Sequence, residues 1–321
     1  MQRKPFSSPS ISDRLTKWYR DRQTEKQLIE YVVETVEPKI RTVSGYRKRL
    51  RNPLQNCLQH CKAMVAQIPG PIHLKRSNYF LDPLIKAAFV GSTKIEDLLA
   101  SSEVQRPQHN FSDSERFALL TMTSTEKTIF GPKKQGEMIV VDAPMQTVTF
   151  TDHKIVGLGT TLESSRDELE RLSLEVIAEA AARQLAARKS HHAELRQQHE
   201  RLRAMARMFG GGSRARSVFG DYNMEEQEKL RKIEHLLQET ELELAAVSKE
   251  IEAPKDRLVM LESCLSAPEK VLAMHLISFR LDWKNVVTAD TEEEAQTFTL
   301  AHFSLNDEVQ REGVLIAYEQ R

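Results

Sequence analysis

The chain has 321 residues, of which 29% are charged and 40% hydrophobic, a composition that suits two folded domains and not a disordered protein. Lys plus Arg and Asp plus Glu number 46 each, so bulk charge indicates neither a nucleic-acid-binding nor a membrane-binding protein. No apolar run is long enough for a transmembrane segment and the three cysteines are too few for a disulfide framework, so we predict a cytoplasmic protein.

The first 111 residues read as a helical region. A helix that begins at Ser12 is expected to end before Pro38, and a further helix is expected to begin at Asn52 and Pro53, which are favourable N-cap and first-turn residues. Pro69, Gly70 and Pro71 close that helix. Two short helices follow, at residues 83–90 and, behind a capping box of Thr93 and Glu96, at residues 94–100.

A basic cluster lies in this region. Residues 1–51 hold thirteen basic and six acidic residues, and the densest group is Arg47, Lys48, Arg49 and Arg51. These residues are the candidate contact for an anion or nucleic acid. The simpler interpretation, which we favour, is the solvated face of a helix.

Cys57, His60 and Cys61, in the sequence CLQHC, are candidate metal ligands. A structural zinc site needs four ligands, however, and the chain has no second cysteine cluster to complete one. Both cysteines fall on the apolar face of the expected helix. We therefore predict core packing, and neither a metal nor a cofactor.

Short β-favouring runs separated by turn residues begin near residue 112, and we expect an antiparallel meander. The runs are 117–123, 127–130, 137–142, 147–151 and 155–158. Ser112 and Glu115 offer a helical alternative for the first run. Asp152 and His153 form an acid–imidazole pair, but neighbouring residues of a strand point to opposite faces, so we favour a structural role.

Two glycine patterns resemble phosphate-binding loops. Gly157–Glu163 lies between a strand and a helix, but Leu162 replaces the third glycine of GxGxxG. Gly131–Gly136 has the spacing of a P-loop, but Glu137 and Met138 follow where Lys and Ser or Thr are required. We predict turns at both.

A heptad repeat near the C-terminal end is the strongest pattern in the chain. Apolar positions alternate in steps of three and four through residues 223–265, and such a seam requires a partner helix. The seam positions are Leu230, Ile233, Leu237, Thr240, Leu244, Val247, Ile251, Pro254, Leu258, Leu261 and Leu265.

The expected partner is residues 164–209, where Leu195, Leu202 and Phe209 form one heptad row and His192, His199 and Ala206 the other. Residues 183–209 carry seven basic and two acidic side chains, whereas residues 223–249 carry four and seven. Opposite charges favour an antiparallel coiled-coil hairpin, and pairing between two chains is the alternative. We interpret the two histidines as polar seam residues, with a pH-sensitive or metal-binding notch as the alternative.

The hairpin turns at residues 210–222, a glycine-rich tip with interleaved basic and aromatic residues. Such a composition is typical of a contact surface, and the candidate partner-binding residues are Phe209, Arg214, Arg216, Phe219 and Tyr222.

Strand patterns resume at residues 271–283, 296–304 and 314–318. Because a hairpin returns the chain to its starting point, we expect these strands to complete the sheet begun before it. The predicted fold is α+β: a helical region (1–111), a sheet body in two parts (112–160 and 266–321) and an inserted coiled-coil hairpin (161–265).

No catalytic signature accompanies this architecture. The leading hypothesis is a non-enzymatic scaffold whose stalk contacts a protein partner, with homo-oligomerisation through the coiled coil left open. The first alternative is a nucleic-acid-associated factor that uses the N-terminal basic cluster and the tip. The second is an enzyme with a site near Asp152 and His153.

Overall fold

The computed structural model describes residues 11–101, 115–135, 138–211, 224–288 and 295–319, and these form an α+β protein. The chain divides into two compact units. The helical unit contains the chain up to Leu54 together with Ala178–Ser266, and the sheet unit contains Gln55–Ile177 and the chain from Ala267. Two of the three boundaries fall within helices α2 (Tyr46–Ala66) and α5 (Leu162–Gly211), and the third lies between Ser266 and Ala267.

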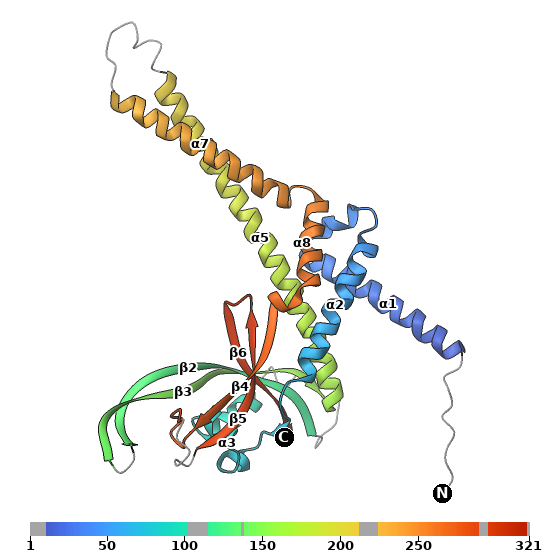
Figure 1. Ribbon diagram of the computed structural model, residues 1–321. Coiled ribbons are helices and arrows are strands. Elements are labelled where there is room, and N and C mark those ends of the chain that lie inside the picture. Colours follow the sequence, from blue (N-terminus) through green and yellow to red (C-terminus); the bar gives the residue numbers. More distant parts are fainter. Residues whose placement is uncertain (1–10, 102–114, 136–137, 212–223, 289–294, 320–321) are drawn as a thin grey trace. The chain divides into compact units, whose positions relative to one another are not determined.

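Six strands form the sheet, in the order β3-β2-β6-β5-β4, with the two-residue β1 paired in parallel to β6. The strands are β1 (Ile72–His73), β2 (Glu115–Gln135), β3 (Met138–Gly159), β4 (Leu272–Leu281), β5 (Gln296–Leu305) and β6 (Val309–Glu319). All other pairings are antiparallel. Because β6 pairs with β2, strands that follow the helical insertion complete the sheet begun before it, as predicted (Figure 1).

The five short runs predicted before the insertion are in fact two long strands. The strand breaks expected near Pro144 and Asp152 do not occur. Local irregularities accommodate these residues within the strands: the pairing register of β2 and β3 shifts at three places, and Asp152 adopts a positive φ of 50°. Pro144 belongs to β3, an edge strand, and lies opposite Phe130 of β2. Proline has no N–H, and an edge strand tolerates this because one of its sides has no neighbouring strand to bond. The helical alternative for residues 117–123 is wrong.

Alternate residues of the strands supply two hydrophobic cores on opposite faces of the sheet. On one face Leu120, Leu300 and Ile316 pack with residues of α3 and α4. On the other, Leu119, Ala301 and Leu315 pack with Val65 and Ile68, near the end of α2, and with Leu169 of α5.

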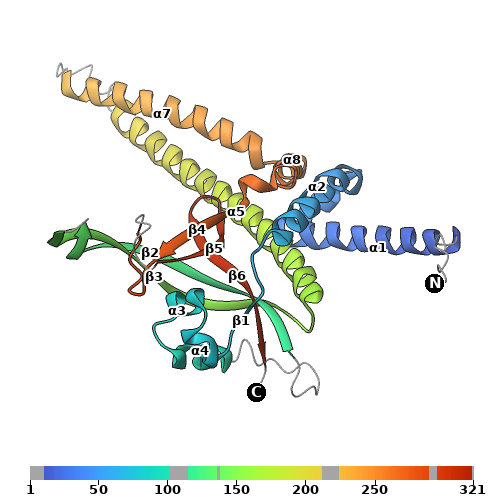
Figure 2. The same cartoon turned by 60° about the horizontal axis from the view of Figure 1, so that its bottom comes forward.

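Helices α3 (Pro83–Ala88) and α4 (Ser92–Leu99) lie close together beside the sheet (Figure 2). Asp82 caps α3 by accepting hydrogen bonds from the amides of Leu84 and Ile85. The capping box predicted for α4 is wrong. Its N-cap is Gly91, so Thr93 lies inside the helix and Glu96 instead meets Arg76.

The glycines at the end of β3 allow this strand and the start of α5 to approach closely. A Cβ on Gly159 would lie 2.4 Å from the amide nitrogen of Ser165, and the Ser165 hydroxyl donates to the carbonyl of Gly157 at 2.6 Å. Thr161 and Ser164 cap the helix reciprocally, each side-chain oxygen accepting from the other's amide at 3.0 Å. The space that a phosphate would need is therefore filled by protein.

The helical unit begins with α1 (Ile11–Val36), which ends before Pro38 as predicted, and a 3₁₀ turn, η1 (Pro38–Thr42). Helix α2 then runs without interruption through Pro53, so the break predicted at Asn52 is wrong. A proline inside a helix costs about 3 kcal/mol. Leu50 and Leu54 on either side of it are fully buried, and their burial offsets that cost.

The second arm of the predicted hairpin is two helices, α7 (Met224–Ile251) and α8 (Pro254–Ser266). Pro254 cannot donate to the helix before it, and the residue before a proline disfavours the helical conformation. The predicted continuous helix through this point is therefore wrong. Within the described ranges, no helix combines the length and the apolar character needed to cross a bilayer.

We expect Gly159→Ser to lower the stability of the sheet unit by roughly 1–3 kcal/mol, because the new Cβ would collide with backbone at the start of α5. The matched control is Gly91→Ser, where the nearest atom to a new Cβ is 3.9 Å away and serine is a better N-cap. Urea denaturation of both variants measures the difference. Equal stabilities would show that the close approach at Gly159 is unimportant.

Candidate functional site

The hairpin formed by α5 and α7 is the candidate binding element of the helical unit. Every predicted seam position of α7 is at least partly buried, whereas the residues between them are exposed apart from Ser248. On α5, Leu195 is buried, and His192, His199, Leu202 and Ala206 are partly buried. The heptad pattern therefore identified the contacting face of α7 correctly, and that of α5 except at Phe209, which was predicted in a seam row but is exposed.

Polar contacts between the arms establish that the helices are antiparallel, and Figure 1 shows α7 running back along α5. The contacts are Arg188–Glu250 at 2.9 Å, His191–Glu243 at 3.2 Å and His192–Ser248 at 2.9 Å. Arg188, nearer the start of α5, meets Glu250 near the end of α7, whereas His191 and His192, further along α5, meet residues that come earlier in α7. His192 is hydrogen-bonded to the hydroxyl of Ser248. In the described part of the chain, no three side chains of His, Cys, Asp or Glu are grouped as metal ligands would be.

Near the base of the hairpin the burial is broader than a two-helix seam. The alanine-rich stretch of α5 buries Ala178, Ala180, Ala181 and Leu185, and small side chains permit close helix packing. Cys264 of α8 lies 3.6 Å from Gln184 of this stretch. This stretch of α5 therefore packs against α8 as well.

One buried carboxylate, Glu37, ties α1 to both later helices. It forms ion pairs with Lys189 of α5 and, at 3.3 Å, with Arg257 of α8. Burial alone would raise the pKa of Glu37, but the two cations outweigh it and hold that pKa below its ordinary value. Sequence patterns did not identify this residue because its partners are more than 150 positions away.

The predicted basic cluster is largely engaged within the helical unit. Arg49 makes a bidentate ion pair with Glu262 at 2.5 and 2.6 Å, and Arg51 pairs with Glu25 at 2.8 Å. Lys48 is exposed. Because carboxylates of the same unit already occupy these guanidinium groups, they offer little to an external phosphate.

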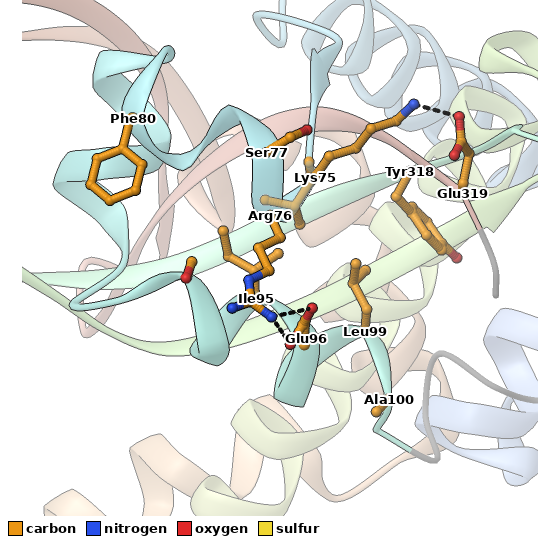
Figure 3. Close-up of a pocket in the computed structure, with 12 residues that line it drawn as sticks. Lys75, Arg76, Ser77, Phe80, Ile95, Glu96, Leu99, Ala100, Tyr318 and Glu319 are labelled. Atoms are coloured by element: carbon orange, nitrogen blue, oxygen red, sulfur yellow. Dashed lines mark hydrogen bonds and ion pairs between the residues drawn. The ribbon is translucent and has the colours of Figure 1, made fainter.

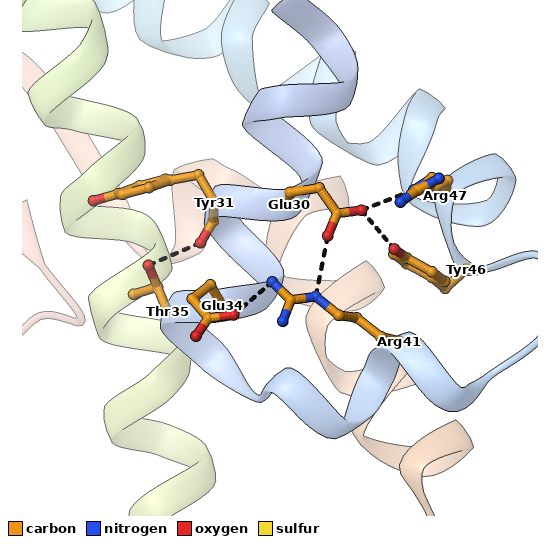
Figure 4. Close-up of polar contacts among 7 residues, drawn as sticks. All are labelled: Glu30, Tyr31, Glu34, Thr35, Arg41, Tyr46 and Arg47. Atoms are coloured by element: carbon orange, nitrogen blue, oxygen red, sulfur yellow. Dashed lines mark hydrogen bonds and ion pairs between the residues drawn. The ribbon is translucent and has the colours of Figure 1, made fainter.

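Arg47, the remaining member, belongs to a network around Glu30 (Figure 4). Glu30 accepts hydrogen bonds from the Tyr46 hydroxyl at 2.5 Å, from Arg47 at 2.7 Å and from Arg41 at 3.1 Å. The Tyr46 bond is the main reason why the pKa of Glu30 is lowered, with the arginines adding to it. The network fixes the turn between α1 and α2.

Large apolar side chains are exposed toward the far end of the hairpin. Met208 is 79% exposed and Met224 81%, and Met205 and Phe209 are 37% and 41% exposed. Arg201, Arg203 and Arg207 are exposed beside them. Of the predicted tip residues only Phe209 is described; Arg214, Arg216, Phe219 and Tyr222 lie outside the described residues.

Met205 and Met208 lie outside the seam, so the heptad pattern does not indicate them. The signal was present: Arg201, Met205 and Met208 have the i, i+4, i+7 spacing of one helix face that is not the seam. Apolar residues outside the seam of a two-helix hairpin have nothing within it to pack against.

The structure buries both cysteines of CLQHC and gives its histidine a backbone partner. Cys57 and Cys61 are free thiols, completely buried, and the hydrogen bond between them together with burial raises the pKa of Cys57. His60 donates from Nε2 to the carbonyl of Leu272 at 2.8 Å. These residues contribute to packing and to a helix–strand contact.

Asp152 and His153 face different partners. Asp152 accepts from Arg311 at 2.7 Å, which lowers the pKa of Asp152. His153 stacks on Phe89 and its Nε2 hydrogen-bonds to the carbonyl of Ala88 at 2.9 Å, and burial lowers its pKa. The neighbouring side chains do not orient each other, as the strand geometry predicts.

The sheet unit contains a pocket of about 800 Å³ between η2 (Arg76–Phe80), α4 and the end of β6 (Figure 3). Two ion pairs line it, Arg76–Glu96 at 3.3 Å and Lys75–Glu319. Its volume is that of a small-molecule site. The charges that line it cancel in pairs, so the pocket favours neither an anion nor a cation.

The fold and these surfaces define an α+β protein with an inserted antiparallel helical hairpin. Comparison of the chain with protein-family models, curated proteins and solved structures finds no match. Functional inference therefore depends on the chemistry of the surfaces themselves.

Leu195→Ala should lower the stability of the helical unit by about 2–4 kcal/mol, because it removes a buried seam side chain and leaves a cavity. Leu242→Ala is the control, since Leu242 is 68% exposed on α7 outside the seam and should change stability by less than about 0.5 kcal/mol. Thermal and urea unfolding followed by helical circular dichroism compare them. A seam that does not stabilise the hairpin would make the two variants alike.

Glu37→Gln should destabilise the helical unit at neutral pH by about 1–3 kcal/mol, because two cations lose a buried carboxylate. The pKa of Glu37 is lowered in the folded protein, so its ionised form contributes stability above the unfolded value near 4.5, and this contribution is lost as the pH falls through the folded pKa. The difference between wild type and variant should therefore shrink below pH 4.5. A difference that is constant from pH 7 to pH 3 would contradict this role.

Proposed function

We propose that the protein is a non-enzymatic interaction protein, a scaffold in which the coiled-coil stalk formed by α5 and α7 presents a contact surface to a protein partner. The observation that carries this proposal is the division of apolar residues along the hairpin. Those of the seam are covered, whereas Met205, Met208 and Met224 near the far end are exposed. Exposed apolar residues grouped on one element are typical of a protein-binding surface.

The nature of these side chains supports the proposal. Methionine is flexible and polarisable and is common on surfaces that adapt to a partner. A hairpin with a satisfied seam also keeps its shape without a partner, which lowers the entropic cost of binding.

The two alternatives have less support. A nucleic-acid-associated role would use Arg47, Lys48, Arg49 and Arg51, but the three arginines are paired with carboxylates of their own unit. An enzymatic role would use Asp152 and His153, which are bound to Arg311 and Ala88 and do not contact each other productively.

A photo-crosslinking experiment tests the scaffold proposal. The full chain carries p-benzoylphenylalanine in place of Met208, which is 79% exposed, or in place of Leu242, a 68% exposed control on the same hairpin. Each protein is irradiated in extract of the cells that make it. We expect a discrete protein adduct from position 208 and none from position 242. No adduct at 208, or the same adducts at both positions, would contradict a partner-binding stalk.

A further inference from the structure

Two histidines and a glutamate form a row across three neighbouring strands of the sheet unit. His275 of β4 lies directly opposite His302 of β5, and His302 lies directly opposite Glu312 of β6. Residues that are directly opposite in antiparallel strands point to the same face of the sheet. The row therefore runs on one face, from the edge strand β4 toward the centre of the sheet.

The glutamate is the buried end of this row. Glu312 is only 2% exposed, and its carboxylate accepts hydrogen bonds from the amide of Ser124 at 2.8 Å and from the Ser124 hydroxyl at 2.7 Å. The oxygen that accepts from the hydroxyl, Oε1, also lies 3.3 Å from Nδ1 of His302. This contact places the proton of a neutral His302 on Nδ1, so Nε2 keeps a free lone pair.

The two imidazole rings are close enough to bind one ion together. Their centroids are 4.7 Å apart and their planes are tilted by 52°. An ion bound at about 2.0–2.1 Å by one nitrogen of each ring would hold the two centroids about 5 Å apart. The observed separation of the His275 and His302 rings fits that arrangement.

The surroundings of the two rings do not oppose a cation. Along β4 and β5, the neighbours of the histidines on the same face are uncharged: Ala273, Ile277, Leu300 and Ser304. Arg311, beside Glu312 in sequence, belongs to the opposite face and is paired with Asp152. His275 is exposed and the side chain of His302 is 14% exposed, so an ion and its remaining water ligands can reach the rings.

We propose that His275 and His302 bind one divalent transition-metal ion through imidazole nitrogen, with Glu312 as the positioning residue that orients His302. A histidine that binds a metal usually donates its other ring N–H to a carboxylate, which is the relation of His302 to Glu312. Imidazole favours Zn²⁺, Ni²⁺ and Cu²⁺, whereas Mg²⁺ and Ca²⁺ favour oxygen ligands. The ion would join the edge strand β4 to β5.

The site supplies two protein ligands, because Glu312 is turned to Ser124 and acts behind His302. This agrees with the finding that no three potential ligands are grouped among the described residues. With fewer ligands than a structural zinc site, we expect a dissociation constant of about 1–100 µM. A metal site in the sheet unit does not depend on the scaffold function of the hairpin.

Isothermal titration of the full chain with ZnCl₂, after treatment with EDTA and desalting, tests the proposal. We expect one Zn²⁺ per chain in this range of affinity and no binding of MgCl₂. Saturating Zn²⁺ should also raise the thermal unfolding midpoint, because the ion binds the folded chain and joins two of its strands.

Three variants assign the binding to the row. His275→Ala and His302→Gln should each weaken Zn²⁺ binding at least tenfold and remove the thermal shift. His275 is exposed, so its removal leaves the core intact, and the amide of glutamine can still donate to Glu312. Glu312→Gln should weaken binding about tenfold, because the orientation of His302 is lost. Circular dichroism verifies that each variant is folded.

His73→Ala is the matched control. Nδ1 of His73 lies 3.2 Å from a carboxylate oxygen of Glu115, but the residue opposite His73 in β6 is Ala317 instead of a second histidine. Its removal should leave the affinity for Zn²⁺ and the thermal shift unchanged.

The proposal is overturned if no Zn²⁺ binds below 1 mM, or if His275→Ala binds as tightly as the wild type. Equal weakening by His73→Ala and His275→Ala would show adventitious binding to surface histidines only. An unchanged affinity in folded Glu312→Gln would exclude the carboxylate as a positioning residue.

Discussion

A seam of apolar side chains between α5 and α7 is the contact on which the helical unit depends. A seam that repeats every 3.5 residues has no stable exposed state in water, so it must be covered by another helix. Here the same chain supplies that helix, in the antiparallel direction. The antiparallel direction is also compatible with the topology of the sheet, because β6 pairs with β2 although more than 100 residues lie between β3 and β4.

Charges serve a different purpose in this protein from the one their clustering suggests. Three arginines near the start of α2 pair with Glu25, Glu30 and Glu262. Glu37 pairs with one cation from α5 and one from α8. Exposed ion pairs contribute little stability individually. Those around the almost buried Glu37 are costly to break, because removing one partner leaves polar groups without water. They specify which helices pack together near the base of the hairpin.

The hairpin separates stability from recognition. Its seam residues are covered and unavailable to a partner, while Met205 and Met208 contribute nothing to the seam and are available. Substitutions on one face should therefore leave the other intact. Strands β2 and β3 extend past the part of β2 that pairs with β6, and Pro132 and Pro144 lie in this extension. Prolines there discourage the exposed strand edges from pairing with other chains.

Local and periodic features were determined by the sequence alone. The heptad rows of α7, the antiparallel partner, the end of α1 before Pro38 and the return of the chain to one sheet all follow from periods of 3.5 and 2 residues and from proline's missing N–H. The burial of Cys57 and Cys61 also follows from their spacing on the apolar face of a helix.

Only the tertiary structure decided how conflicting local signals are resolved. Pro53 remains inside a helix because buried leucines flank it, whereas Pro254 ends one, and no local rule distinguishes the two. Turn residues near Pro144 and Asp152 stay within one strand because a long antiparallel neighbour is available to pair with it. The partners of Glu37 and of Arg49 are more than 150 residues distant, and which charges meet over such a distance depends on the packing of helices that the sequence pattern does not specify.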